Sequence, residues 1–180
     1  WGIPYQLIGN RGLFDQEEIR ILIYFAKAVV NPQDSVNLFQ LLQAAIFQIA
    51  PAELLSYLAQ SRAVRIPLWE LIRKKADQAQ KLQFFLEQIQ NSQNKVTKNP
   101  ASKVLFDFMT ESGFIKEILA VDSLENQLKV KNLNLFFQKL KNFEAENPQA
   151  TLVEFIDWLE LLIEAGENPA QAEIEDIDTV

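Results

Sequence analysis

Residues 13–34 read LFDQEEIRILIYFAKAVVNPQD, and this stretch decides the fold class of the chain. Its apolar residues recur at steps of three and four positions: Ile19, Leu22, Ile23, Ala26 and Val30. That spacing places them on one face of an α-helix. We therefore predict a helix that buries one face in a core.

Both ends of this helix carry signals of their own. Asp15 and Glu18 are spaced as a capping box, in which each side chain satisfies a backbone N–H group of the first turn, and Phe14 is placed to pack beneath it. Pro32 disfavours helical geometry at Asn31, and Asp34 is suited to cap a second helix. The stretch thus predicts two helices joined by a tight turn.

Similar patterns continue outward along the chain. Further helices are predicted after Asp34, from Pro51, from Leu68, from Pro100 to Gly113, around 114–119, over 123–146 and from Thr151 to Gly166. The helix from Leu68 either bends or runs on toward Ile89, and the polar stretch 91–100 is predicted as a loop. The expected fold class is all-α, an irregular bundle of seven or eight helices.

The terminal segments differ from the helical middle. The opening WGIPYQLIG has the composition of a short β-strand, and with the turn that follows it makes up residues 1–12. Residues 167–180 are acidic and end EIEDIDTV, a candidate pairing partner for that strand. We expect a single helical domain over residues 1–180 that has these two segments at its ends.

The composition excludes several kinds of site. The chain has no Cys and no His, so it contains no disulfide framework, no thiolate metal site and no catalytic group based on imidazole. None of its five Gly residues belongs to a phosphate-binding loop. No apolar run approaches the ~20 residues of a membrane span. We expect a soluble, cytoplasmic protein without catalytic, cofactor or metal residues of its own.

Charge is distributed unevenly in a chain whose net charge is −7. Residues 144–180 contain eleven acidic residues and no basic one, whereas residues 62–98 contain eight basic residues and three acidic ones. The basic residues are Arg62, Arg65, Arg73, Lys74, Lys75, Lys81, Lys95 and Lys98. Residues 62–98 are therefore a candidate surface for a polyanion, and residues 144–180 are not. Within residues 62–98 the run IRKK, residues 72–75, is more often a solvated helix face than a phosphate-contacting patch.

Aromatic residues form a stripe near the C-terminus: Phe136, Phe137, Phe143, Phe155 and Trp158. A base-stacking platform would need such rings at the surface. At helical spacing they belong far more often to a core, so we predict that they pack inside.

The opening of the chain also has a recognisable order of motifs. Gly-Ile-Pro-Tyr is followed by a short apolar strand ending in Gly, a Phe, an acid before Ile, a helix and Asn-Pro-x-Asp. The matching residues are Gly2, Ile3, Pro4, Tyr5, Gly9, Phe14, Glu18, Ile19, Asn31, Pro32 and Asp34. This order resembles the superfamily 1 DNA helicases of the UvrD/Rep type.

Residues 130–162, VKNLNLFFQKLKNFEAENPQATLVEFIDWLELL, are similar to a later pattern of the same helicases. That pattern is an Asn-Leu pair, a long helix ending Phe-Glu, and a second helix entered through Thr or Ser and Leu. The resemblance therefore spans nearly the whole chain. It implies the accessory 2B subdomain, a helical insertion within the second motor domain, and hence a piece of a longer protein whose two ends lie close together.

The resemblance also implies where the missing chemistry lies. In these helicases ATP and Mg²⁺ bind in the motor domains, outside the inserted region, so this chain alone is expected to hydrolyse nothing. Its implied role in DNA unwinding and repair is accessory and regulatory, through rigid-body reorientation. The implied partners are the motor domains of the same protein, duplex DNA in a weak or indirect contact, and a regulatory protein.

One departure affects the expected DNA contact. Where the family often has Arg-Gly-Ile-Gly, a turn thought to meet duplex DNA through backbone N–H groups, this chain has Phe47-Gln48-Ile49-Ala50. Gln48, Ile49 and Ala50 remain candidates, and the alternative surface is Arg62, Arg65, Arg73, Lys74 and Lys75. The rival interpretation is a stand-alone helical scaffold that binds a protein through an apolar groove.

Overall fold

The computed structural model describes residues 12–172, and within them the fold is all-α, as predicted. Nine α-helices make up this part of the chain, one more than the upper expectation. They are α1 (Glu17–Val30), α2 (Ser35–Leu42), α3 (Pro51–Ala63), α4 (Leu68–Lys75), α5 (Gln80–Gln93), α6 (Ala101–Glu111), α7 (Phe114–Leu119), α8 (Leu124–Glu146) and α9 (Leu152–Glu164). Three-residue 3₁₀ turns occupy Leu13–Asp15, Ala45–Phe47 and Ala76–Gln78.

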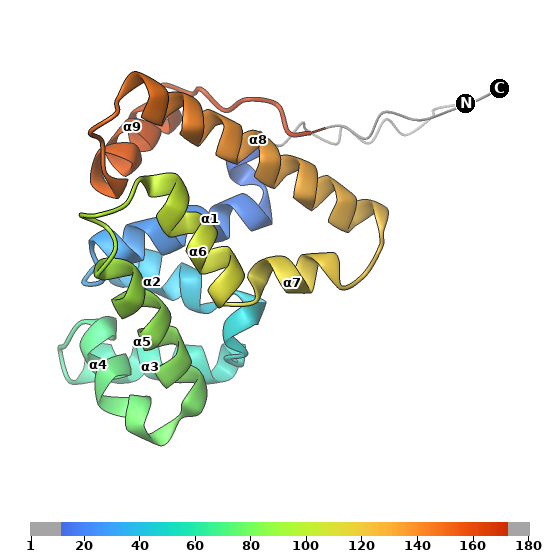
Figure 1. The fold of residues 1–180 in the computed structure, drawn as a ribbon. Helices are drawn as coiled ribbons and strands as arrows, with labels where there is room; N and C mark the ends of the chain where they lie inside the picture. The colour runs from blue at the N-terminus through green and yellow to red at the C-terminus, as the bar shows by residue number, and fades with distance from the viewer. Residues whose placement is uncertain (1–11, 173–180) are drawn as a thin grey trace, which may run out of the picture.

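Helix α1 is the centre of the fold and contacts α2, α5, α8 and α9 (Figure 1). The prediction of a single apolar face was too narrow. Phe25, Ala28 and Val29 are buried as well, because neighbouring helices cover α1 on several sides. Phe25 stacks on Phe108 of α6 with the ring centroids 3.6 Å apart, which joins α1 to α6.

Two groups of helices lie at opposite ends of the molecule. In Figure 1, α8 and α9 lie across the top, and α3, α4 and α5 lie at the bottom. Phe136, Phe143 and Phe155 are buried between α8 and α9. The ring centroids of Trp158 and Phe143 lie 4.9 Å apart. The aromatic stripe is thus mainly core, as predicted.

Several predicted helix ends are confirmed. The Asp34 carboxylate accepts hydrogen bonds from the backbone N–H groups of Val36 and Asn37 at the start of α2. Thr151 and Glu154 form a capping box at the start of α9. Gly113 and Gly166, which follow α6 and α9, adopt the left-handed conformation that glycine reaches without strain.

The capping box predicted for Asp15 and Glu18 is wrong. Glu18 is buried, and its carboxylate accepts a hydrogen bond of 2.7 Å from the side-chain amide of Asn132 in α8. Asp15 lies in a 3₁₀ turn and accepts a bond from Asn168. Both side chains bind amides more than one hundred residues distant instead of the start of α1, which local spacing cannot reveal.

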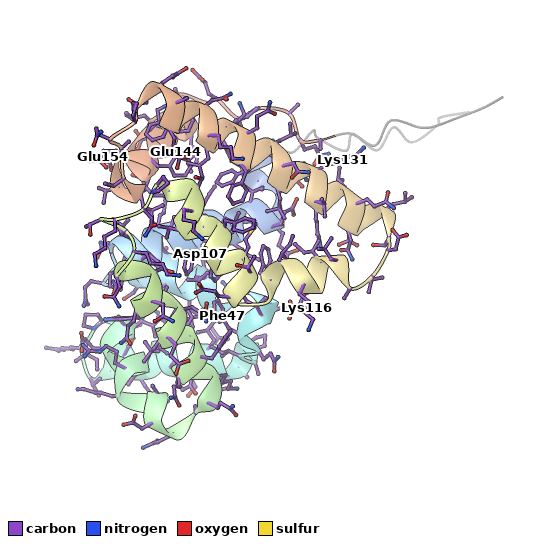
Figure 2. The ribbon with its side chains drawn as sticks, in the orientation of Figure 1. Phe47, Asp107, Lys116, Lys131, Glu144 and Glu154 are labelled. Atoms are coloured by element: carbon purple, nitrogen blue, oxygen red, sulfur yellow. The ribbon has the colours of Figure 1, made fainter. Side chains whose placement is uncertain are left out.

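The chain between α4 and α6 also differs in detail from the prediction. Residues 76–79 break the helix, and this separation accounts for the ninth helix. Helix α5 then extends to Gln93, so residues 91–93 of the predicted loop 91–100 are helical. The start of α6 is capped by a residue distant in sequence, because the Glu144 carboxylate accepts hydrogen bonds of 2.7 and 2.8 Å from the backbone N–H and the hydroxyl of Ser102. Glu144 is labelled in Figure 2.

The two ends of the described chain meet in a short pairing that we call the stem, residues 12–15 and 168–172. Gly12 and Ala170 form an antiparallel bridge, and the Leu13 N–H donates to the Pro169 carbonyl at 2.7 Å. A Cβ atom on Gly12 would lie 1.9 Å from Asn168 Cγ, so any other residue here would displace the Asn168 side chain. The predicted strand in residues 1–12 and the end of the acidic segment fall almost entirely outside the described residues.

A buried relay of hydrogen bonds fastens the stem to the core. The Ala172 N–H donates to the side-chain oxygen of Asn132 at 2.7 Å, and the Asn132 amide donates to Glu18 at 2.7 Å. Asn132 is 1% exposed and Glu18 is 4% exposed. The last described residues are thereby bound to the first turn of α1, and we count Glu18 and Asn132 as part of the stem.

Candidate nucleic-acid interface

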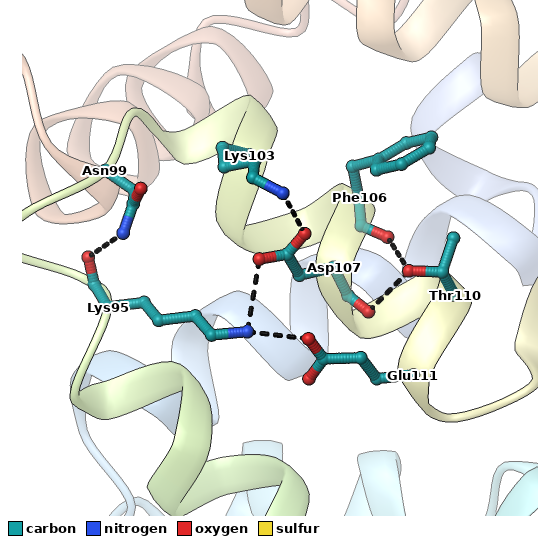
Figure 3. A network of polar contacts seen from close by, with 7 residues as sticks. All are labelled: Lys95, Asn99, Lys103, Phe106, Asp107, Thr110 and Glu111. Carbon is teal, nitrogen blue, oxygen red and sulfur yellow. Dashed lines mark hydrogen bonds and ion pairs between the residues drawn. The ribbon is translucent and has the colours of Figure 1, made fainter.

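The basic residues of 62–98 fall into two groups according to whether an acid neutralises them. Lys95 Nζ lies 3.1 Å from Asp107 and 2.7 Å from Glu111, and Lys103 Nζ lies 2.5 Å from Asp107 (Figure 3). We call this group the Lys95 network. It ties the turn after α5 to α6, so Lys95 serves the fold rather than a polyanion.

The Lys95 network changes the acidity of its members. Partial burial raises the pKa of Asp107, but hydrogen bonds from Lys103 and Lys95 outweigh it and hold that pKa below its ordinary value. The hydrogen bond to Glu111 is the main cause of a raised pKa for Lys95. Both groups are therefore held in their charged forms.

Lys81, at the start of α5, is also paired with an acidic residue. Glu53 in the first turn of α3 pairs with Lys81 and accepts a hydrogen bond from the Tyr57 hydroxyl. Lys75 Nζ stands 5.6 Å from the centre of the Tyr57 ring, within range of a cation–π contact. Burial, with the bond to Glu53 second, raises the pKa of Tyr57 to about 12. Lys75 and Lys81 are thus both engaged by α3.

Arg73 and Lys74 occupy the solvent-facing side of α4, which we call the α4 outer face. The Arg73 guanidinium lies 3.6 Å from the Glu70 carboxylate. This ion pair is long and exposed, so it contributes little to stability. Lys74 is exposed and makes no ion pair with any residue between 12 and 172. Both cations lie in the last turn of a helix, where the helix dipole favours positive charge.

Arg62 and Arg65 line a groove of about 420 Å³ that we call the α2–α3 groove. The remaining lining residues are Ser35, Val36, Phe39 and Gln40 from α2 and Leu58, Ser61 and Ile66 from α3 and the turn after it. Both arginines are exposed, and neither makes an ion pair within the described chain. No carboxylate lines the groove.

An unusual turn holds Arg65 at the groove. The Ile66 N–H donates to the Ser61 carbonyl and the Arg65 N–H to the Arg62 carbonyl, which is the Schellman pattern at the end of a helix. Arg65 has φ 55°, the left-handed conformation that glycine usually supplies at this position. A residue other than glycine in this conformation costs about 1 kcal/mol.

The turn before α3 is formed by the other candidates. Gln48 has φ 53° and is exposed, so the chain takes a left-handed turn without the family's glycine. Ala50 is also exposed, but the Ile49 side chain is 8% exposed and packs inward. Only the backbone of Ile49 is therefore a candidate for contact.

The predicted residues do not form one cluster. The turn at Gln48 precedes the first residue of α3, whereas Arg62 lies in its last turn, which puts them about 18 Å apart along the helix axis. Gln48 instead lines another depression of about 420 Å³ together with Lys81. The structure thus offers three separate surfaces: the Gln48 turn, the α4 outer face and the α2–α3 groove.

A metal-binding cluster and a membrane-spanning helix were both sought among residues 12–172. Between residues 12 and 172, no group of three or more Asp and Glu side chains is arranged to hold a metal ion. None of the described helices combines the length and the apolar character that a bilayer span demands.

One protein family matches nearly the whole chain. Residues 1–177 match the UvrD-like helicase C-terminal domain family. The chain belongs to this family. As a UvrD-like helicase C-terminal domain, it is similar to the ATP-dependent DNA helicase PcrA of Bacillus subtilis, with 21% identity over 89% of this chain and 23% of the relative. It is also similar to an ATP-dependent helicase/nuclease subunit of Staphylococcus haemolyticus, with 24% identity over 93% of this chain and 14% of the relative.

The chain spans less than a quarter of the length of these two relatives. Within this UvrD-like domain, the described motif residues support the fold. Phe14 and Ile19 are buried, Glu18 holds Asn132, and Asn31, Pro32 and Asp34 form the turn and cap between α1 and α2. Pro4, Tyr5 and Gly9 lie outside the described residues.

Sequence reasoning missed the two asparagines that close the stem. Asn132 lies within the second motif, but its local pattern indicates no role for it. Asn168 donates to Asp15 and accepts from the Phe14 N–H at 3.0 Å. An Asn beside Pro169 signals a turn, yet nothing local indicates a partner at the other end of the domain.

Proposed function

We propose that this chain is the accessory 2B subdomain of an ATP-dependent DNA helicase of the UvrD/Rep type in superfamily 1. The match to the UvrD-like helicase C-terminal domain over residues 1–177 carries the proposal. The stem supports it, because a domain inserted into another must leave and return at neighbouring points. The alternative, a stand-alone scaffold, has no need for such a pairing.

In this role the chain catalyses nothing by itself. ATP and Mg²⁺ act in the motor domains of the parent protein, which are its intramolecular partners, and the domain regulates unwinding by changing its orientation about the stem. DNA repair and a cytoplasmic location are part of the same proposal. They rest on the resemblance to helicases of the UvrD/Rep type, whereas the two relatives, an ATP-dependent DNA helicase and part of a helicase/nuclease, support the helicase role alone.

The α4 outer face is the surface we assign to duplex DNA. Arg73 and Lys74 are exposed, adjacent and at most weakly paired, so meeting phosphates would disrupt little of the fold. Two such cations give a weak contact that depends strongly on salt. The Gln48 turn is less suited, because its side chain takes the place where close backbone approach would use glycine.

Fluorescence anisotropy with a labelled DNA duplex tests this assignment. We expect weak binding at low salt, and Arg73→Gln with Lys74→Gln should reduce the slope of log K against log[salt] by about 2. Lys98→Gln is the matched control, since Lys98 is exposed and makes no ion pair within the described residues. Absence of duplex binding at low salt, or an equal loss with the control, would remove duplex contact from the proposal.

A second candidate function rests on the α2–α3 groove. Its apolar floor serves no purpose in phosphate binding, so it favours a protein ligand. The domain can therefore bind a regulatory protein in addition to its part in the helicase.

A further inference from the structure

The α2–α3 groove joins an apolar floor to a basic rim. Val36 and Phe39 contribute from one side and Leu58 and Ile66 from the other. Val36 is 71% exposed, and the other three are partly exposed, so apolar side chains from both helices line one depression that is open to water. Contiguous apolar surface rimmed by polar groups is typical of a protein-binding site.

The rim is positive in a protein that is otherwise acidic. The whole chain carries 24 acidic and 17 basic residues, yet no acid lines this groove, and Arg62 and Arg65 have no ion pair within residues 12–172. Elsewhere in the same basic run, Lys81 and Lys95 are neutralised by Glu53 and Asp107. The charge of the rim is thus left for a ligand.

Arginine suits this task better than lysine would. A guanidinium group can donate two parallel hydrogen bonds to one carboxylate. Because Arg62 and Arg65 are only three positions apart, they can pair with two acidic residues on one short segment. The Schellman turn fixes the backbone at Arg65 and keeps both side chains at the same end of α3.

We propose that the α2–α3 groove docks an acidic amphipathic segment of a partner protein. Apolar side chains of the segment occupy the space between Val36, Phe39 and Ile66, and its carboxylates pair with Arg62 and Arg65. This is the helix-in-groove mode of peptide recognition with charge complementarity added. A DNA backbone fits less well, because it presents phosphates without the apolar groups that would cover the floor. The proposal is independent of the duplex contact assigned to the α4 outer face.

The test begins with random-peptide phage display against the full 180-residue chain. We expect the enriched sequences to combine at least two acidic residues with apolar residues at helical spacing. A synthetic copy of an enriched peptide, labelled with fluorescein, then provides a binding curve by anisotropy. Enrichment of basic or neutral peptides alone would overturn the proposal.

Variants locate the binding. The double substitution Arg62→Glu/Arg65→Glu should weaken peptide binding at least about 10-fold, which corresponds to the loss of one good charged contact. Val36→Ser should weaken it severalfold while leaving the fold intact, because Val36 is largely exposed. Arg73→Gln with Lys74→Gln is the matched control and should leave peptide affinity unchanged. Equal peptide binding by the Arg62/Arg65 variant would overturn the proposal.

A charge exchange provides the sharpest measurement. The peptide with its acidic residues replaced by lysine should bind the Arg62→Glu/Arg65→Glu variant more tightly than it binds the natural chain. If that variant instead loses duplex DNA binding and no acidic peptide binds the natural chain, the groove is a phosphate site and the proposal fails. Circular dichroism of each variant confirms that the helices are retained.

Discussion

The stem and the α2–α3 groove both contain polar side chains, but they use them in opposite ways. In the stem, Glu18 and Asn132 are almost fully buried, and each has a partner. At the groove, Arg62 and Arg65 are exposed and make no ion pair in the part of the chain that the structure describes. The contrast separates polar groups that hold the fold from polar groups that are available to a ligand.

This difference has an energetic origin. A buried polar group that loses its partner costs its full desolvation energy, whereas an exposed charge exchanges a partner for water at little cost. Substitutions in the stem should therefore reduce the free energy of unfolding. Substitutions at the groove should change binding and leave that free energy nearly constant.

The largest effect is expected at the stem. Asn132→Leu leaves the Glu18 carboxylate without its donor and the Ala172 N–H without its acceptor, which should lower the free energy of unfolding by about 2–4 kcal/mol. Urea denaturation measures it, with Asn134→Leu on the exposed side of α8 as control. A loss below about 0.5 kcal/mol would contradict the stem as a buried anchor.

A double substitution sharpens the same point. Replacing Glu18 and Asn132 together with apolar residues removes both the acceptor and the donor, so it should cost less than the sum of the single changes. Additive losses would indicate that the two side chains act independently.

The Lys95 network is an intermediate case. Asp107 is only 14% exposed and has two lysine partners, so Asp107→Asn should lower the free energy of unfolding by about 1–2 kcal/mol at neutral pH. Because the fold lowers the pKa of Asp107, this contribution is present above about pH 4 and fades as the pH falls through the folded pKa. Urea denaturation from about pH 7 to about pH 3 should show that the free energy of unfolding falls less in the Asp107→Asn variant than in the natural chain. An identical pH profile in both proteins would rule out the network as its source.

Backbone strain gives a smaller effect of opposite sign. Gln48→Gly and Arg65→Gly should each raise the free energy of unfolding by about 0.5–1 kcal/mol, because both residues hold a left-handed conformation. Alanine at the same positions is the control and should give no such gain. If Arg65→Gly brings stability but loses peptide affinity, the groove retains its arginine at the expense of stability.

The smallest effect is expected at the groove itself. Arg62→Ala should change the free energy of unfolding by less than about 0.5 kcal/mol, since no described residue depends on its charge. Thermal or urea denaturation measures the change. A larger loss would place Arg62 with the structural residues of the stem.

Local signals predicted those parts of the fold that depend on neighbouring residues. Asp34 and Thr151 cap the helices that follow them, Gly113 ends α6, and the phenylalanine spacing of α8 and α9 indicated the core. Each of these features is decided within about one helical turn of the residue concerned. The all-α class followed from their sum.

The remaining features depend on residues that are distant in sequence. Glu18 has the spacing of a capping residue, but its partner Asn132 lies 114 positions away. Likewise, all eight cations of residues 62–98 are alike in sequence, and only the packing of α3 and α6 decides that Lys81 and Lys95 are neutralised while Arg62 is not. The candidate surfaces were therefore predictable as a set of residues, but their separation was not.

The bridge between Gly12 and Ala170 has a mechanical consequence. Backbones paired in this way run about 5 Å apart, so under the proposed insertion into a longer helicase the forces on the two ends of the domain would share almost one point of application. With so short a lever arm they transmit tension well and torque poorly. A load applied at α3 or α4, at the far end of the molecule in Figure 1, would act through a much longer arm and swing the whole body about that point.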